Sequence, residues 1–106
     1  MGIIMKEIKG ELNQVIEEIN EISVYIYQQD LRNGLMKLDG TLGNIMKVLN
    51  SVLIYAAENN IQIDQKSIIS NLTAAMQALE EKDYVLLADI LLYEIAEQFH
   101  EILNLL

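Results

Sequence analysis

Apolar residues recur every three or four positions along almost the whole chain, and no proline interrupts them. This spacing matches the 3.6-residue period of an α-helix, so each run forms an apolar stripe that can face a core. The first stripe predicts a helix over about residues 6–28, and it consists of Ile8, Leu12, Val15, Ile19, Ile22 and Ile26. The charged and amide side chains of this segment fall on the opposite side.

The second segment begins after Asp30, a residue type that favours the N-cap position of a helix. Its apolar stripe continues without a change of phase through Asp39-Gly40, a pair that often forms a turn. A turn would reset the phase, so the sequence predicts one long helix over residues 31–58. Gly40 and Gly43 then fall on its outer face.

Two shorter helices are predicted in the second half of the chain, over residues 65–81 and 84–105. Asp64 is the expected N-cap of the third helix, and Ile63 and Ile68 are spaced as a hydrophobic staple. The expected core stripe of the third helix is Ile68, Ile69, Leu72, Ala75, Met76 and Leu79. That of the fourth helix is Tyr84, Val85, Ala88, Leu91, Leu92, Ile95, Phe99, Ile102, Leu103 and Leu106.

Four amphipathic helices joined by short connections predict an all-α fold, an antiparallel up-down-up-down four-helix bundle that forms one domain over residues 1–106. An alternative architecture exchanges the long second helix between two chains.

The chain has no cysteine, which excludes disulfides and thiolate metal sites. Its N-terminal apolar run is too short for a signal peptide and no stretch is long enough to span a membrane, so we expect a soluble, cytoplasmic protein.

The charge balance argues against two classes of partner. Sixteen acidic residues face seven basic ones, for a net charge of −9. Nucleic acids and anionic membrane surfaces are bound by clustered lysine and arginine, so neither is an expected partner. Residues 1–29 carry −3 (two lysines, five glutamates) and residues 83–106 carry −5 (five acids, no base). Acidic charge is therefore concentrated on the first and last helices.

The residues that could carry catalysis or bind a metal do not form a complete set. Glu97 and His100 have the Glu-x-x-His spacing of di-iron bundles, but His100 is the only histidine and a second such helix cannot exist. The helical phase also places both residues off the core stripe. The serines have no Gly-x-Ser-x-Gly context, and no phosphate-binding glycine loop is present. We therefore expect no enzymatic activity, no cofactor and no metal site.

The fourth helix carries more apolar residues than one core stripe requires. Leu86, Leu87 and Ile90 are predicted to project from its sides, and Tyr93 extends the same face. Exposed contiguous apolar surface usually marks an interface, although the edges of the first and third helices could also cover it. The candidate interface residues are Leu86, Leu87, Asp89, Ile90 and Tyr93.

The segment from Ala78 to Ile95 resembles the C-terminal part of a group of small helical proteins of Gram-positive, clostridial-type bacteria. The shared pattern is Asp-Tyr-x-Leu-x-Ala-Asp-x-Leu-x-Tyr-Glu, and this chain has Ile95-Ala96-Glu97 where the group has a proline. The resemblance implies an interaction role connected with bacterial motility and draws attention to Asp89 and Tyr93, which could hydrogen-bond across one helix turn.

The sequence thus predicts a non-enzymatic protein–protein interaction module that binds a second copy or another protein, with self-association through the fourth helix. An alternative is a chaperone-like bundle that binds an amphipathic client helix in motility or export.

Overall fold

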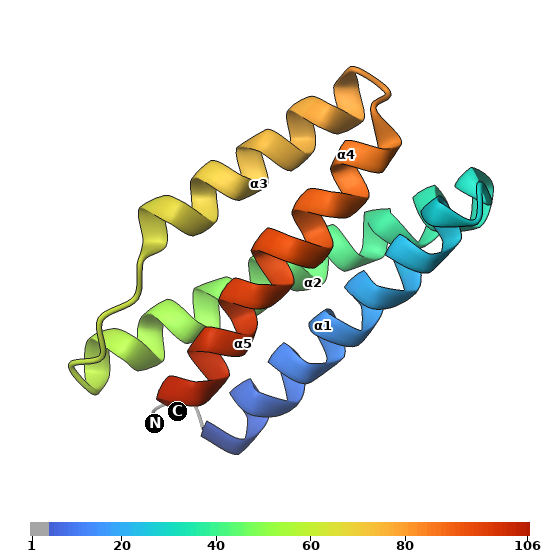
Figure 1. The fold of residues 1–106 in the computed structure, drawn as a ribbon. Helices are drawn as coiled ribbons and strands as arrows, with labels where there is room; N and C mark the ends of the chain where they lie inside the picture. Colours follow the sequence, from blue (N-terminus) through green and yellow to red (C-terminus); the bar gives the residue numbers. More distant parts are fainter. Residues whose placement is uncertain (1–4) are drawn as a thin grey trace.

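The computed structural model describes residues 5–106, and every element in that range is helical (Figure 1). Residues 1–4, which belong to the short N-terminal apolar run, lie outside this range. The elements are α1 (Met5–Tyr27), α2 (Leu31–Glu58), α3 (Gln65–Glu80), α4 (Tyr84–Asp89), η1 (Ile90–Ile95) and α5 (Ala96–Leu105). The last three are one continuous helix, here called the fourth helix. The prediction of an all-α four-helix bundle is confirmed, with helix boundaries within one residue of those expected.

The three connections between the helices use the same local chemistry. Each helix that follows a connection is capped by an aspartate whose side chain accepts a hydrogen bond from the backbone N–H three residues later, as seen for Asp30, Asp64 and Asp83. Each connection also contains one residue in the left-handed region, namely Gln29 (φ 63°), Asn60 (φ 55°) and Lys82 (φ 59°). The chain therefore reverses direction three times within a few residues.

Successive helices run antiparallel along the long axis of a molecule that measures 43 × 23 × 20 Å (Figure 1). α1 packs along α2, and the fourth helix packs against both α1 and α3. The two helices that carry most of the acidic charge are therefore neighbours. One core fills the space between the helices, and its largest fully buried side chains include Ile8, Leu12, Ile19, Ile22, Ile45, Leu87, Leu91, Ile95 and Phe99.

α2 runs unbroken through Asp39-Gly40, as its apolar phase predicts. Gly40 and Gly43 lie on the surface with open space around them. The close approach occurs instead at Gly34, where an added Cβ would lie 3.1 Å from Ile26 Cγ1 and 3.3 Å from Tyr25 Cβ. Gly34 thus lets the start of α2 pack tightly on the end of α1.

The middle of the fourth helix is a π-helical turn, η1, in which the N–H of Ala96 bonds to the carbonyl of Leu91. The four residues Leu87, Leu91, Ile95 and Phe99 are all fully buried, although they are spaced four apart three times in succession. In a regular α-helix each such step would rotate the side chain by about 40°, and the stripe would leave the core. The π-turn takes up one extra residue and keeps the four side chains on one face.

Two residues assigned to core stripes lie on the surface. Ile69 of α3 is 46% exposed and Val85 of α4 is 57% exposed. Both stand at the edge of their stripe, where a neighbouring helix must be present to cover them. The space next to Ile69 is an open groove between α2 and α3. Ala78 is buried instead, where α3 meets α4.

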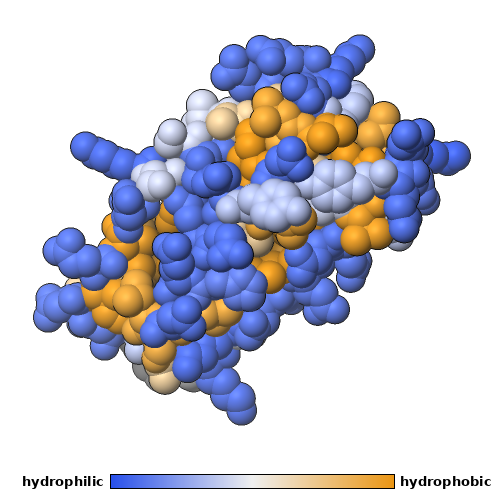
Figure 2. Space-filling view, viewed as in Figure 1, coloured by the Kyte–Doolittle hydropathy of each residue, from blue (hydrophilic) through white to orange (hydrophobic). Residues whose placement is uncertain are grey.

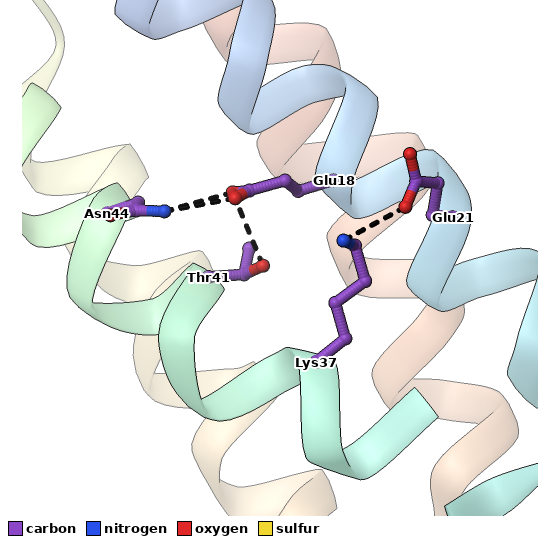
Figure 3. Close-up of polar contacts among 5 residues, drawn as sticks. All are labelled: Glu18, Glu21, Lys37, Thr41 and Asn44. Atoms are coloured by element: carbon purple, nitrogen blue, oxygen red, sulfur yellow. Dashed lines mark hydrogen bonds and ion pairs between the residues drawn. The ribbon is translucent and has the colours of Figure 1, made fainter. Parts of the chain in front are cut away.

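Polar contacts between α1 and α2 hold the register of this pair (Figure 3). The half-buried carboxylate of Glu18 accepts two hydrogen bonds from Asn44 Nδ2, at 3.0 and 3.1 Å, and a longer one from Thr41. One turn further along, Lys37 Nζ lies 2.9 Å from the carboxylate of Glu21, and this hydrogen bond raises the pKa of Lys37. The contact with Glu18 is the better shielded of the two and contributes more to stability.

Candidate protein interface

The structure divides the five candidate interface residues into two groups. Leu86 and Tyr93 are 43% and 63% exposed, and Asp89 is half-buried between them. Leu87 is fully buried and Ile90 is 9% exposed, so both belong to the core and not to the surface. The prediction that they project into solvent was wrong, because α1 and α3 cover both sides of the fourth helix and the π-turn turns its apolar stripe inward.

Asp89 is joined to the end of α1. The hydroxyl of Tyr27 donates a hydrogen bond to Asp89 Oδ1. The sequence had suggested that Asp89 pairs with Tyr93 across one helix turn, and the structure pairs it with Tyr27 instead. We call Tyr27, Leu86, Asp89 and Tyr93 the tyrosine patch. Figure 2 views the molecule with the fourth helix in front, and apolar surface is visible there between polar and pale side chains.

Tyr27 was missed by the sequence reasoning because it belongs to a different helix from the other three residues. It is 42% exposed and follows Ile26, the last core residue of α1. The sequence could have indicated Tyr27 only through the expected contact between the first and last helices. The ends of α1 and α4 meet in an antiparallel pair, so an aromatic residue at the end of α1 is placed next to the first turns of α4.

The environment of the tyrosine patch raises the pKa of Tyr27. Burial of the hydroxyl, together with the hydrogen bond to Asp89 and its negative charge, raises the pKa of Tyr27 to about 12, and Tyr93 adds to the rise. The unfolded value is about 10. The contribution of this contact to stability is therefore complete below about pH 10 and is lost as the pH rises through about 12.

We expect the ultraviolet titration of tyrosine ionisation to contain a component near pH 12 that disappears in Tyr27→Phe. In Asp89→Asn, the pKa of Tyr27 should fall because the carboxylate charge is gone, but it should stay above about 10 because burial of the hydroxyl, the largest cause of the rise, remains. A wild-type titration without the component near pH 12 would contradict this placement of the Tyr27 hydroxyl, buried and next to the carboxylate of Asp89.

The residues considered for metal binding and catalysis do not come together. Glu97 and His100 are both exposed on α5. Within residues 5–106, no three His, Asp or Glu side chains are grouped so that they could hold a metal ion. Ser23 is buried with no hydrogen-bond partner for its hydroxyl, and Ser67 Oγ accepts a hydrogen bond from Gln98 at 2.8 Å.

The fold and the patch define an acidic, all-α four-helix bundle that displays aromatic and apolar side chains on its fourth helix. The chain belongs to the DUF8042 family, a domain of unknown function whose model matches residues 3–105. No curated protein and no solved structure matches the chain. Over the part of the chain that the structure describes, none of the helices has the length and apolar character needed to cross a membrane.

Proposed function

We propose that this protein is a non-enzymatic protein–protein interaction module, and that it self-associates through the tyrosine patch. The observation that carries the proposal is the exposure of three large side chains, Tyr27, Leu86 and Tyr93, around one carboxylate. The carboxylate of Asp89 already accepts a hydrogen bond from Tyr27, which offsets part of the cost of covering it.

The chemistry of the patch suits a contact surface. Tyrosine provides a large apolar ring with a polar tip, and it is enriched at protein interfaces. The bond to Asp89 fixes the ring of Tyr27 before any partner arrives, which lowers the entropy lost on binding. A two-fold symmetric dimer would place the patch of one copy on the patch of the other.

Charge should make this association depend on salt. The helices that form the patch belong to the most acidic segments of the chain, with −3 over residues 1–29 and −5 over residues 83–106. Two copies that meet here repel each other, while the apolar contact between them is not weakened by salt. Added salt screens the repulsion, so the dimer should strengthen as the ionic strength rises.

Sedimentation of the wild type beside Leu86→Glu and Tyr93→Glu tests the proposal. We expect a dimer for the wild type and monomers for both variants. Met36→Glu is the matched control, because Met36 is 69% exposed on α2 and the substitution adds the same charge away from the patch. A wild type that stays monomeric at millimolar concentration and high salt would rule out self-association, as would equal weakening by all three substitutions.

We expect the protein to act in the cytoplasm of a Gram-positive bacterium, because residues 83–94 resemble a segment of small clostridial-type proteins.

A second candidate function is a chaperone-like bundle that binds an amphipathic client helix in motility or export. The observation that favours it is an apolar groove between α2 and α3, on a different side of the molecule from the tyrosine patch.

A further inference from the structure

Two helical hairpins make up the bundle (Figure 1). The first consists of α1 and α2, joined by residues 28–30, and the second consists of α3 and the fourth helix, joined by residues 81–83. The helices of each hairpin pack along each other, and the hairpins meet where α1 packs on the fourth helix. By contrast, α2 and α3 lie apart along most of their length, and Met46 and Ile69 line the groove between them. The backbones of the two hairpins therefore approach each other mainly between α1 and the fourth helix.

Polar contacts join the helices within each hairpin. In the first hairpin, the contacts of Glu18 and Glu21 described above link α1 to α2. In the second, the half-buried side chain of Gln98 on α5 donates a hydrogen bond to Ser67 Oγ at 2.8 Å and accepts one from Asn71 at 3.1 Å. Both partners of Gln98 lie on α3. Each hairpin thus has directional contacts of its own, which fix the register of its two helices.

The contact between the two hairpins is almost entirely apolar. Four side chains of the fourth helix are fully buried in the core that it shares with α1, namely Leu87, Leu91, Ile95 and Phe99. Within residues 5–106, the bond from Tyr27 to Asp89 is the one side-chain hydrogen bond that links the hairpins. A single hairpin cannot keep its apolar stripe away from water, so each hairpin needs the other one or an identical copy of it.

Residues 59–64 connect the hairpins and are twice as many as the residues of either other connection. Asn60, in the left-handed region with φ 55°, follows the end of α2, and Asp64 caps α3. The hydrogen bonds that the structure shows for this connection reach no further than the last turn of α2 and the first turn of α3. Ile63 packs against the core, but a hollow of about 400 Å³ separates Gln62 and Ile63 from α5. The connection is therefore loosely held and can straighten.

We propose that two copies of this chain exchange hairpins, so that α1 and α2 of one copy pack on α3 and the fourth helix of the other. The partner is a second copy, because the surface that covers the fourth helix within one chain is α1 of the same sequence. Exchange preserves the apolar contacts of the core, and Tyr27 of one copy then bonds to Asp89 of the other. The exchanged dimer and the monomer therefore differ mainly in the conformation of residues 59–64. Exchange is independent of self-association through the tyrosine patch, since each half of the exchanged dimer carries a complete patch.

The position of the connection predicts the shape of the exchanged dimer. Residues 59–64 lie at one end of the long axis, and this number of extended residues spans up to about 20 Å. When they straighten, α3 continues away from α2 instead of turning back, so the two halves lie end to end. The longest dimension should be close to twice the 43 Å of one copy. Separation of the copies must open the core, which makes it slow, whereas a contact between surface patches is lost quickly on dilution.

The test refolds Leu86→Glu from urea at millimolar concentration, because this variant removes self-association through the tyrosine patch. We expect a dimer that persists for hours after dilution to micromolar concentration and has nearly twice the length of the monomer in X-ray scattering. Half of the copies carry ¹³C before refolding, so that nuclear Overhauser effects between labelled and unlabelled copies can be detected. The ring of Phe99, on the helix that packs against α1, should show such effects with isoleucines of α1, which only exchange can produce.

Two variants of the connection, both made in the Leu86→Glu chain, provide matched controls with an unchanged core. Deletion of Ile61 and Gln62 keeps Ile63 and the cap Asp64 but shortens the connection, which hinders the return of the second hairpin onto its own α1. It should raise the dimer-to-monomer ratio at least about tenfold. Insertion of two glycines after Gln62 relaxes the connection and should lower the ratio.

Any of three results would overturn the proposal. One is that both Leu86→Glu and the deletion variant remain monomeric after refolding at millimolar concentration. Another is a dimer in which Phe99 shows no effect with α1 of the other copy, since the copies would then meet through their surfaces. The last is an equal dimer-to-monomer ratio in the deletion and insertion variants. If the deletion variant does not fold, the refolded Leu86→Glu chain decides the test alone.

Discussion

Replacement of Phe99 by alanine should lower the free energy of unfolding by about 3–5 kcal/mol. Phe99 is the largest fully buried side chain of the core and lies on α5, where this helix packs against α1. Its removal exposes no polar group, so the loss comes from the apolar contacts and from the cavity that remains. A domain of this size has a total stability of roughly 5–15 kcal/mol, and the variant should be close to unfolding at room temperature.

Urea unfolding followed by circular dichroism measures this effect. Phe99→Leu is the matched control, because it keeps most of the apolar volume and should cost roughly half as much or less. His100→Ala changes the next residue, which is exposed, and should be within about 0.5 kcal/mol of the wild type. A loss below about 1 kcal/mol for Phe99→Ala would mean that Phe99 is not at the centre of the core.

Deletion of Tyr93 should leave the fold intact, whereas deletion of Asn20 should unfold the protein. Tyr93 lies on the surface of the π-turn, which holds one residue more than an α-helix needs. Without Tyr93, Leu91 and Ile95 become three positions apart, and a regular α-helix brings both to the core. Asn20 lies in a regular part of α1, and its deletion would rotate Ile22 and Ile26 by about 100° away from their partners.

The expected costs differ widely. Deletion of Tyr93 should cost about 2 kcal/mol or less, within the range of ordinary substitutions. Deletion of Asn20 exposes at least two isoleucines, each worth about 1.5–3 kcal/mol of burial, and it also breaks the contacts around them. Urea unfolding measures the stability of the two deletion variants, and amide proton spectra show whether each keeps the fold. If the two deletions destabilise equally, the π-turn does not accommodate the extra residue.

Much of the fold could be predicted from local patterns. The apolar stripes placed the helices, and the phase of the second stripe through Asp39-Gly40 showed that α2 is continuous. Asp30 and Asp64 identified the starts of α2 and α3, because a capping side chain acts within its own turn. These features depend on residues close in sequence, so periodicity and capping chemistry are enough to find them.

The candidate interface was predicted less well because burial depends on neighbouring helices. Leu87 and Ile90 were assigned to the surface on the assumption of a regular α-helix. The spacing of Leu87, Leu91, Ile95 and Phe99 already departed from that period, and it was the available sign of the π-turn. Tyr27 could not be linked to Asp89 from sequence, since 62 positions separate them and only the packing of α1 on α4 brings them together.

Of the apolar residues on the fourth helix that were predicted to be exposed, only some are on the surface. The number of helices, their ends, the absence of a cysteine or multi-histidine site, and the concentration of acid at the two ends of the chain all follow from the order of the residues alone. Tertiary structure decided which apolar residues remain exposed, namely Leu86 and Tyr93 on the fourth helix and Met46 and Ile69 beside the groove. The physical reason is that a stripe shows which side of a helix is apolar, whereas the distances between helices decide how much of that side is covered.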